Sequence, residues 1–325
     1  MAKLVVTGGM GFIGSNFITY WLEKHPNDEI INLDALTYAG WRRNTEDSAH
    51  LSNYRFVHGS ITDTVLLHSL LTDGVDAIVH FAAETHVDRS IESPASFIHT
   101  NVWGTHQLLQ AARAHQIPKF ILISTDEVYG TLGVNGMFTE QSPLMPNSPY
   151  SASKASGDLV ARSYYETYGY PVIVTRCSNN YGPRQFPEKL IPKIIHQAMN
   201  NEPIPIYGDG SHIRDWLYVM DHCAAIEQVM MNGKSGEVYN IGGHNEHTNL
   251  EVAQHILQIM GKSDDLIQFV QDRPGHDKRY AIDAAKMEKE LGWVPVYTFE
   301  QGIHETVRWY MEHPDWWEHK GEGNR

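Results

Sequence analysis

The sequence predicts an α/β fold in which a doubly wound parallel sheet is joined to a smaller C-terminal α/β domain. Short runs rich in valine and isoleucine recur along the first half of the chain, and most of the stretches between them have helical periodicity. The runs are continuously apolar rather than alternating, as Phe120–Ile123 illustrates. Strands need this character when helices cover both faces of their sheet.

The predicted strands, in chain order, are Lys3–Thr7, Glu29–Leu33, Tyr54–His58, Asp76–Phe81, Lys119–Ser124 and Pro171–Thr175. Beyond about Asn179, proline and glycine become frequent, which indicates a smaller domain built from insertions. Val238–Ile241 again has the character of a sheet strand. We therefore expect one domain over residues 1–178, to which residues 216–243 return, and a second domain over residues 179–215 and 244–325.

Composition limits the partners of this protein. The chain has 325 residues with 42% hydrophobic and 20% charged side chains, enough to bury a full core, and its formal charge of −14 disfavours nucleic acid or an anionic membrane as a partner. Cys177 and Cys223 lack the spacing of a disulfide framework, and no signal peptide or spanning stretch is evident, so we expect a cytoplasmic protein. The histidines show no metal-ligand motif, and no metal site is predicted.

A glycine-rich turn follows the first predicted strand. Gly8, Gly11 and Gly14 form a GxxGxxG pattern that leads into a helix. Glycines let the chain turn tightly against a pyrophosphate, which the amides of the helix N-terminus then hold. The second strand ends near Asp34, where a carboxylate would bind the adenosine ribose and repel a 2′-phosphate. These features predict a Rossmann-type domain that binds NAD rather than NADP.

Two further segments carry candidate catalytic residues. Ser124–Gly130 reads Ser-Thr-Asp-Glu-Val-Tyr-Gly and follows the fifth strand, at the edge of the sheet where ligands bind. Tyr150 and Lys154 are four residues apart, so on one helix they share a face, and the ammonium would lower the phenol pKa from its ordinary value of ~10. Such a Tyr/Lys pair arises by chance on many helices, but beside the glycine turn and Asp34 chance becomes the minor explanation.

Together these motifs resemble the extended short-chain dehydrogenase/reductase family. That resemblance implies that Tyr150 deprotonates a sugar hydroxyl while NAD takes the hydride, that Lys154 supports the tyrosine and the nicotinamide ribose, and that Thr125 holds the oxygen. Over essentially the whole chain, the narrower resemblance is to the dTDP-glucose 4,6-dehydratases. It rests on Ser124–Gly130 and on five more segments: Leu33–Gly40, Ala82–Ser90, Ser178–Pro183, Phe186–Pro192 and Arg273–Asp277.

The narrower resemblance implies a reaction in which dTDP-glucose becomes dTDP-4-keto-6-deoxyglucose and water, as a step of deoxysugar biosynthesis with dTDP-rhamnose as the expected end product. After oxidation at C4, Glu127 removes the C5 proton, a protonated Asp126 donates to the departing C6 hydroxyl, and the hydride returns to C6. Neighbouring residues on a strand face opposite ways, so the chain must bend after Thr125. Asp126 must also be held protonated by burial or by the charge of Glu127.

The resemblance also implies two sets of binding residues. The expected NAD-binding residues are Gly8, Gly11, Phe12, Ile13, Gly14, Asp34, Thr37, Ser60, Ile61, Ala82, Ala83, Thr85, Tyr150 and Lys154. The expected substrate-binding residues are Thr85, Asp88, Asn179, Glu188, Lys189, Leu190, Pro205, Tyr207, Arg214, Asn249, Arg273 and His276. Ser60 departs from the family pattern, which commonly has an aspartate there that meets the adenine amine. The family usually forms homodimers, for which the helix carrying Tyr150 is a candidate interface.

Several alternatives share these motifs. A nucleotide-sugar 4-epimerase or a uronate decarboxylase would also use Asp34, Tyr150 and Lys154, but would not need Asp126 as a general acid. Dehydratases acting on UDP-glucose or CDP-glucose differ only in the few residues that contact the base. A non-catalytic NAD-binding sensor predicts a broken catalytic set, whereas this chain carries the complete one.

Overall fold

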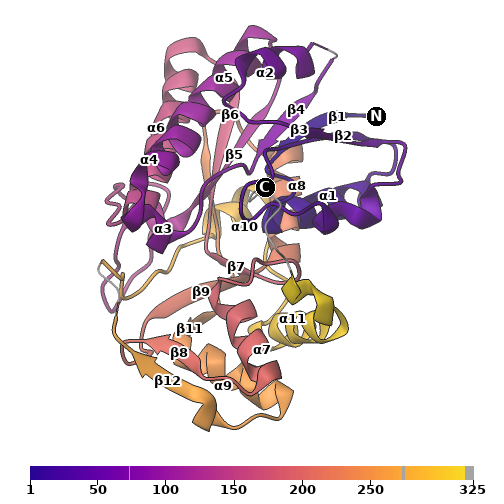
Figure 1. Cartoon of the computed structure of the whole chain (residues 1–325). Helices are drawn as coiled ribbons and strands as arrows, with labels where there is room; N and C mark the ends of the chain where they lie inside the picture. Colours follow the sequence, from indigo (N-terminus) through magenta and orange to yellow (C-terminus); the bar gives the residue numbers. More distant parts are fainter. Residues whose placement is uncertain (73, 273–274, 319–325) are drawn as a thin grey trace.

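The computed structural model describes residues 1–72, 74–272 and 275–318. Its larger part, at the top of Figure 1, is a parallel sheet whose strands follow the order β10-β6-β5-β4-β1-β2-β3. Within the described residues this sheet has seven strands: β1 (Lys3–Thr7), β2 (Glu29–Asp34), β3 (Tyr54–His58), β4 (Ala77–His80), β5 (Phe120–Thr125), β6 (Val172–Cys177) and β10 (Val238–Ile241). The predicted doubly wound fold is confirmed.

Successive residues of the central strands point into two different cores. Leu4 and Val6 of β1 belong to one apolar cluster, whereas Val5 between them belongs to another. This is why the strands had to be apolar at every position. The first core is covered by α1 (Phe12–Lys24), α8 (Val219–Asn232) and α10 (Ala285–Leu291), and the second by α2 (Thr64–Leu70), α5 (Thr105–Ala114) and α6 (Pro149–Tyr168).

A smaller lobe lies below the large sheet in Figure 1 and has its own core, in which Ile195, Trp216 and Val252 are buried. It contains the sheet β11-β9-β7 and the strand pair β12-β8. The strands of the lobe are β7 (Asn179–Tyr181), β8 (Ile204–Tyr207), β9 (Ile213–Tyr218), β11 (Glu246–Thr248) and β12 (Ile267–Val270), and its long helices are α7 (Leu190–Asn200), α9 (Asn249–Met260) and α11 (Phe299–Glu312).

The chain passes between the two parts more than once. β10 pairs in parallel with β6, with Val238 opposite Val174, and α8 packs against α1. The helix α10 also contacts β10 and α8, and Met287 on it is fully buried in the core of the large sheet. One segment of residues 244–325, which the sequence analysis placed in the smaller domain, therefore packs on the larger sheet.

Short helical segments connect these elements: η1 (Arg42–Ser48), α3 (Val87–Glu92), α4 (Pro94–Phe97), the π-helical η2 (Ile98–Gly104), η3 (Asp126–Tyr129), η4 (Asp264–Leu266) and η5 (Pro314–Glu318). Across the described ranges, none of the helices combines the length and the apolar character needed to cross a membrane.

Candidate active site

A cavity of about 340 Å³ opens at the carboxyl ends of the large sheet, where ligands bind in open α/β folds. Many residues from distant parts of the sequence line it together. From the predicted sets these are Gly8, Gly11, Phe12, Ile13, Gly14, Asp34, Thr37, Ser60, Ile61, Ala82, Ala83, Thr85, Thr125, Asp126, Glu127, Tyr150, Lys154, Asn179, Glu188 and Lys189. The cavity thus joins the predicted cofactor and catalytic residues in one site.

The glycine turn is packed too closely for side chains. Gly8 has a φ of 75°, and a Cβ placed there would lie 2.5 Å from the backbone nitrogen of Ala82. A Cβ on Gly14 would lie 2.5 Å from the carbonyl oxygen of Gly8. Helix α1 begins directly after Gly11, so the first-turn amides of a long helix border the cavity. This arrangement fits the pyrophosphate of a dinucleotide.

Asp34 ends β2 with its carboxylate held in a fixed orientation. Its Oδ2 accepts a hydrogen bond from the Met10 amide at 2.9 Å, and its Oδ1 accepts one from the Leu36 amide at 2.8 Å. Burial raises the pKa of Asp34, and these two backbone hydrogen bonds act in the opposite direction. The carboxyl group lines the cavity, which suits it to a ribose hydroxyl.

Ser60 also lines the cavity, but its hydroxyl is engaged locally. Ser60 Oγ accepts a hydrogen bond from the Thr62 amide at 3.1 Å and lies 2.8 Å from Thr62 Oγ1. Compared with an aspartate, this short side chain offers less acceptor capacity toward an adenine amine.

The chain bends sharply where β5 ends. Asp126 and Glu127 are adjacent in the sequence, so this bend is needed for both side chains to reach one site. After Thr125 it enters the short helix η3, and the Glu127 amide donates to Thr125 Oγ1 at 3.3 Å. Asp126 is only 1% exposed. Burial raises its pKa well above the ordinary range, and the nearby carboxylates of Glu127 and Asp215 raise it further. Asp126 therefore favours the protonated form.

Helix α6 presents Tyr150 and Lys154 to the same cavity, and both side chains are buried. Burial and the charge of Glu127 raise the pKa of Tyr150, whereas a hydrogen bond with Thr125 lowers it. Lys154 Nζ donates to the carbonyl oxygen of Ile123 at 2.8 Å, and burial lowers its pKa. The sequence analysis expected the lysine to lower the tyrosine pKa, but in this structure burial dominates both groups.

The predicted substrate-binding residues fall into two groups. Thr85, Asn179, Glu188 and Lys189 line the cavity, and Lys189 Nζ donates to the Thr85 carbonyl at 3.0 Å. Asp88 lies in the first turn of α3, and Leu190 begins α7. Neither belongs to the cavity lining, and Arg273 lies outside the described residues.

The second group lies in the smaller lobe and includes Arg214. Arg214 Nη2 donates to the Asp277 carbonyl at 2.8 Å, and the charge of Arg214 also lowers the pKa of Asp126. The ring of Tyr207 lies 6.0 Å from that of His276. Pro205 is on β8, and Asn249 begins α9. None of these residues lines the main cavity.

Sequence reasoning missed two buried polar residues that shape the site. Asn101, in the π-helical segment η2, donates to Ser153 Oγ at 2.8 Å and accepts from the Glu84 amide at 2.8 Å. Asp215 accepts hydrogen bonds from the Gly243 and Asn245 amides at 2.9 and 2.8 Å. The adjacent charged residues Arg214 and Asp215, followed by Trp-Leu-Tyr within β9, were the one available signal for Asp215, and nothing in the sequence pattern distinguished Asn101.

Comparison with known proteins gives a family and close relatives. The family model described as GDP-mannose 4,6 dehydratase matches residues 5–306. A dTDP-glucose 4,6-dehydratase of Xanthomonas campestris pv. campestris (strain B100) is 51% identical over 335 residues, which cover 97% of this chain and 95% of that protein.

Solved structures agree with this similarity. DesIV, a dTDP-glucose 4,6-dehydratase from Streptomyces venezuelae with NAD and TYD bound, is 50% identical, with a TM-score of 0.95 over 97% of this chain and 99% of that one. The UDP-glucose 4-epimerase of Thermotoga maritima has a TM-score of 0.90 over 96% of this chain and 99% of that one, at 28% identity. The fold is shared with both kinds of enzyme, and the sequence is nearer to the dehydratases.

Proposed function

The chain belongs to the GDP-mannose 4,6 dehydratase family, and we propose that it is an NAD-dependent hydro-lyase that converts dTDP-glucose to dTDP-4-keto-6-deoxyglucose and water. The observation that carries this proposal is the pair Asp126 and Glu127 at the bend after β5. Asp126 is buried with a raised pKa, and Glu127 lines the same cavity. An elimination needs an acid and a base beside one substrate, and two carboxyl groups in different surroundings supply them.

The cavity residues divide the proton transfers among them. Tyr150 accepts the proton of the C4 hydroxyl, with Thr125 hydrogen-bonded to the same phenol. Glu127 removes the proton from C5 once the neighbouring carbon is a ketone. Asp126 then donates its proton to the C6 hydroxyl as it leaves, so the bond from C6 to oxygen breaks while a double bond forms between C5 and C6. A hydride returned to C6, which the reduced cofactor would supply, together with a proton added at C5 would complete the 6-deoxy product.

The residues around the glycine turn fit NAD. Gly8 and Gly14 leave the close backbone approach that a pyrophosphate needs, and Asp34 presents a buried carboxylate at the ribose end. When bound, NAD supplies the hydride acceptor for C4, the hydride donor for C6 and a cationic ring whose charge favours the phenolate of Tyr150. Lys154, anchored on the Ile123 carbonyl, would hold the nicotinamide ribose.

The smaller lobe would hold the nucleotide. Arg214 is buried, and its positive charge lowers the pKa of Asp126. It would bind the diphosphate together with Asn249. Tyr207 and Pro205 would pack on the base, with His276 beside them. Thymine is preferred over uracil or cytosine on the strength of the dTDP-glucose relatives. The 4-keto-6-deoxy product would enter deoxysugar biosynthesis.

We further propose a cytoplasmic homodimer. Ile98 and Trp103 of η2 and Leu159 of α6 are exposed although apolar, and η2 and α6 pack side by side. These side chains would be buried if the same helices of a second copy packed against them. Cys177 and Cys223 are both buried free thiols, in keeping with a reducing compartment.

Incubation of the purified protein with dTDP-glucose, without added NAD, tests the proposed activity. We expect the loss of one water by mass spectrometry and a new C6 methyl signal by NMR, because the hydride is returned within each turnover. An unchanged mass with inverted C4 would instead identify an epimerase. No reaction with dTDP-, UDP- or CDP-glucose, even with NAD, would support a non-catalytic sensor.

A further inference from the structure

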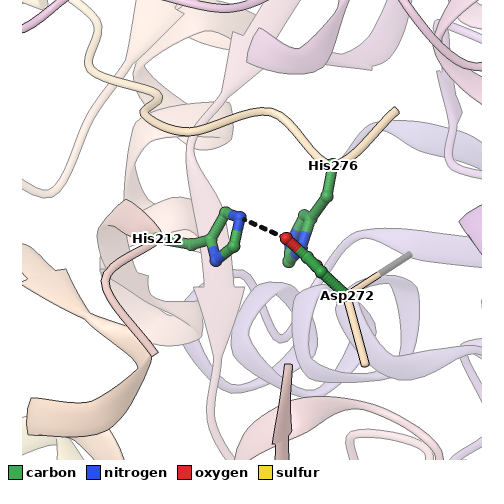
Figure 2. Close-up of side chains that lie close together, drawn as sticks. All are labelled: His212, Asp272 and His276. Atoms are coloured by element: carbon green, nitrogen blue, oxygen red, sulfur yellow. Dashed lines mark hydrogen bonds and ion pairs between the residues drawn. The ribbon is translucent and has the colours of Figure 1, made fainter. Parts of the chain in front are cut away.

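Polar side chains also form hydrogen-bonded clusters outside the cavity lining. In the smaller lobe, the rings of His212 and His276 stack face to face, with centroids 3.7 Å apart and planes inclined by 15°, and Asp272 lies beside them (Figure 2). The nitrogen lone pairs of stacked rings lie in parallel planes and do not meet at one ion, and His276 belongs to the proposed nucleotide site. Another cluster, at the start of α6, lies beside the two catalytic acids.

The serine hydroxyls of α6 have different kinds of partner. Ser156 Oγ donates to the Ala152 carbonyl of its own helix at 2.8 Å, which is the bond that a serine within a helix commonly makes. Ser151 Oγ instead donates to Glu127 Oε2 at 3.3 Å, from α6 to the bend after β5. The hydroxyl of Ser151 therefore leaves its own helix and contacts the proposed general base.

Ser148 extends this contact and fixes its direction. It is the N-cap of α6, and its Oγ accepts a hydrogen bond from the Ser151 amide at 3.0 Å. The hydroxyl oxygens of Ser148 and Ser151 lie 2.7 Å apart. Because Ser151 gives its single hydroxyl proton to Glu127, its oxygen accepts in the contact with Ser148. The hydrogen bonds therefore run in one direction, from Ser148 through Ser151 to the carboxylate, and each polarises the next.

The burial of both serines strengthens their hold on the carboxylate. Ser151 is 1% exposed and Ser148 is 9% exposed, so bulk water competes little for these hydroxyls. A hydrogen bond to a carboxylate is stronger in such low-dielectric surroundings. A glutamate side chain has several rotatable bonds, whereas a general base must be held within hydrogen-bond reach of the proton that it removes. The serine pair can therefore restrain the Glu127 carboxylate.

We propose that Ser151, supported by Ser148, is a positioning residue that holds Glu127 for removal of the C5 proton. The inference rests on the proposed dehydratase function and adds two residues to the expected catalytic set. Ser151 does not line the cavity, so it acts through Glu127 rather than on the substrate. Oxidation at C4 uses Tyr150 and not Glu127, so the loss of the Ser151 hydroxyl should impair the elimination and spare the oxidation.

Single turnover of the NAD-loaded protein with dTDP-glucose, followed by the absorbance of NADH, tests this role in Ser151→Ala. The absorbance rises with oxidation at C4 and falls when the hydride returns to C6, so the two phases are measured separately. We expect the rise at the wild-type rate and the fall slowed by about 10–100-fold, the effect of losing a hydrogen bond to a charged group. Substrate deuterated at C5 should slow the fall further, because breaking the C5–H bond then limits it.

The matched control is Ser156→Ala, which removes a hydroxyl that bonds the backbone of the same helix, and both phases should match the wild-type protein. Ser148→Gly, a change that an N-cap tolerates, should slow the fall alone and to a smaller extent than Ser151→Ala. Circular dichroism checks that each variant folds.

A wild-type rate of fall in Ser151→Ala, or equal slowing of both phases, would overturn the proposal. Product analysis of the wild-type protein separates this result from a failure of the proposed function. If the wild-type protein forms the 6-deoxy product and Ser151→Ala behaves like it, only the role of Ser151 is wrong. If the wild-type protein forms none, the dehydratase function and this inference fail together.

Discussion

Ser151 Oγ donates a hydrogen bond to Glu127 Oε2 at 3.3 Å, and this contact ties the helix that carries Tyr150 to the bend that carries the two acids. Asp126, the neighbour of Glu127 in the sequence, has different surroundings, because it is buried beside Asp215. One bend therefore gives adjacent carboxyl groups two environments, one of which favours the protonated acid.

Because of this difference, we expect variants of Glu127 and Asp126 to be impaired at different steps of the reaction. In D₂O, we expect Glu127→Gln to lose deuterium incorporation at C5, because no base removes that proton. Asp126→Asn should retain exchange at C5 but lose water slowly. Each variant should lower kcat by about 10²–10⁴-fold, the usual range for a general acid or base. NMR of the nucleotide-sugar pool measures both effects, and equal loss of exchange in the two variants would contradict this division of roles.

Asp126 also predicts a pH-dependent stability difference. Its pKa in the folded protein is raised from the ordinary value of 3.8, so above about that pH the unfolded chain releases this proton while the folded chain still holds it. The contribution of Asp126 to stability therefore falls as pH rises from about 4 until its folded-state pKa is passed. It costs ~1.4 kcal/mol for each unit of the shift.

Asp126→Asn removes this cost, so its melting temperature relative to the wild-type protein should increase as pH rises above about 4. Differential scanning calorimetry across the pH range measures the trend. Glu202→Gln is the control, since Glu202 is exposed, and its difference from wild type should not vary with pH. A flat difference for Asp126→Asn would mean that the carboxyl group is ionised in the folded protein.

The close packing of the glycine turn predicts that replacing one glycine by alanine weakens cofactor binding. In Gly14→Ala the new Cβ would lie 2.5 Å from the Gly8 carbonyl oxygen and 2.9 Å from Gly9 Cα, so the turn must shift. We expect NAD bound after gel filtration, measured by absorbance of the released cofactor, to fall at least ~10-fold. Gly133→Ala is the matched control, because a Cβ there meets nothing within 4 Å. Equal NAD content in the two variants would count against this role for the turn.

The buried ion pair between Arg176 on β6 and Asp158 on α6 should contribute strongly to stability. Arg176 Nε donates to Asp158 Oδ2 at 2.8 Å, with side chains 7% and 2% exposed. Asp158→Ala would leave the guanidinium buried without its carboxylate, and we expect a loss of about 3–5 kcal/mol in the free energy of unfolding by urea.

An exposed ion pair on α6, the helix that also carries Asp158, provides the comparison. Arg162 Nη2 lies 3.3 Å from Glu166 Oε1, with side chains 69% and 58% exposed. Glu166→Ala should cost about 0–1 kcal/mol in the same experiment. Similar losses for the two variants would mean that solvent reaches the Arg176 pair.

The sequence by itself determined the local structure and the cofactor loop. Continuous apolar runs mark strands covered on both faces, and those that the sequence predicts for the large sheet correspond to β1–β6 and β10. The four-residue spacing of Tyr150 and Lys154 places both on one face of α6, because helical periodicity is a local property. The glycine turn and Asp34 could be located for the same reason, since each follows directly from the end of a strand.

Only the tertiary structure decided the surroundings of these groups. Asp126 has a raised pKa because packing buries it and brings Asp215 beside it from a distant strand. Packing likewise joins Asn101 to Ser153, and the pairing of β8 with β12 joins His212 to Asp272. Burial and contacts between distant segments depend on how whole elements pack, which local spacing does not specify. The residue types of the site could be read from the sequence, whereas their protonation and partners depend on the fold.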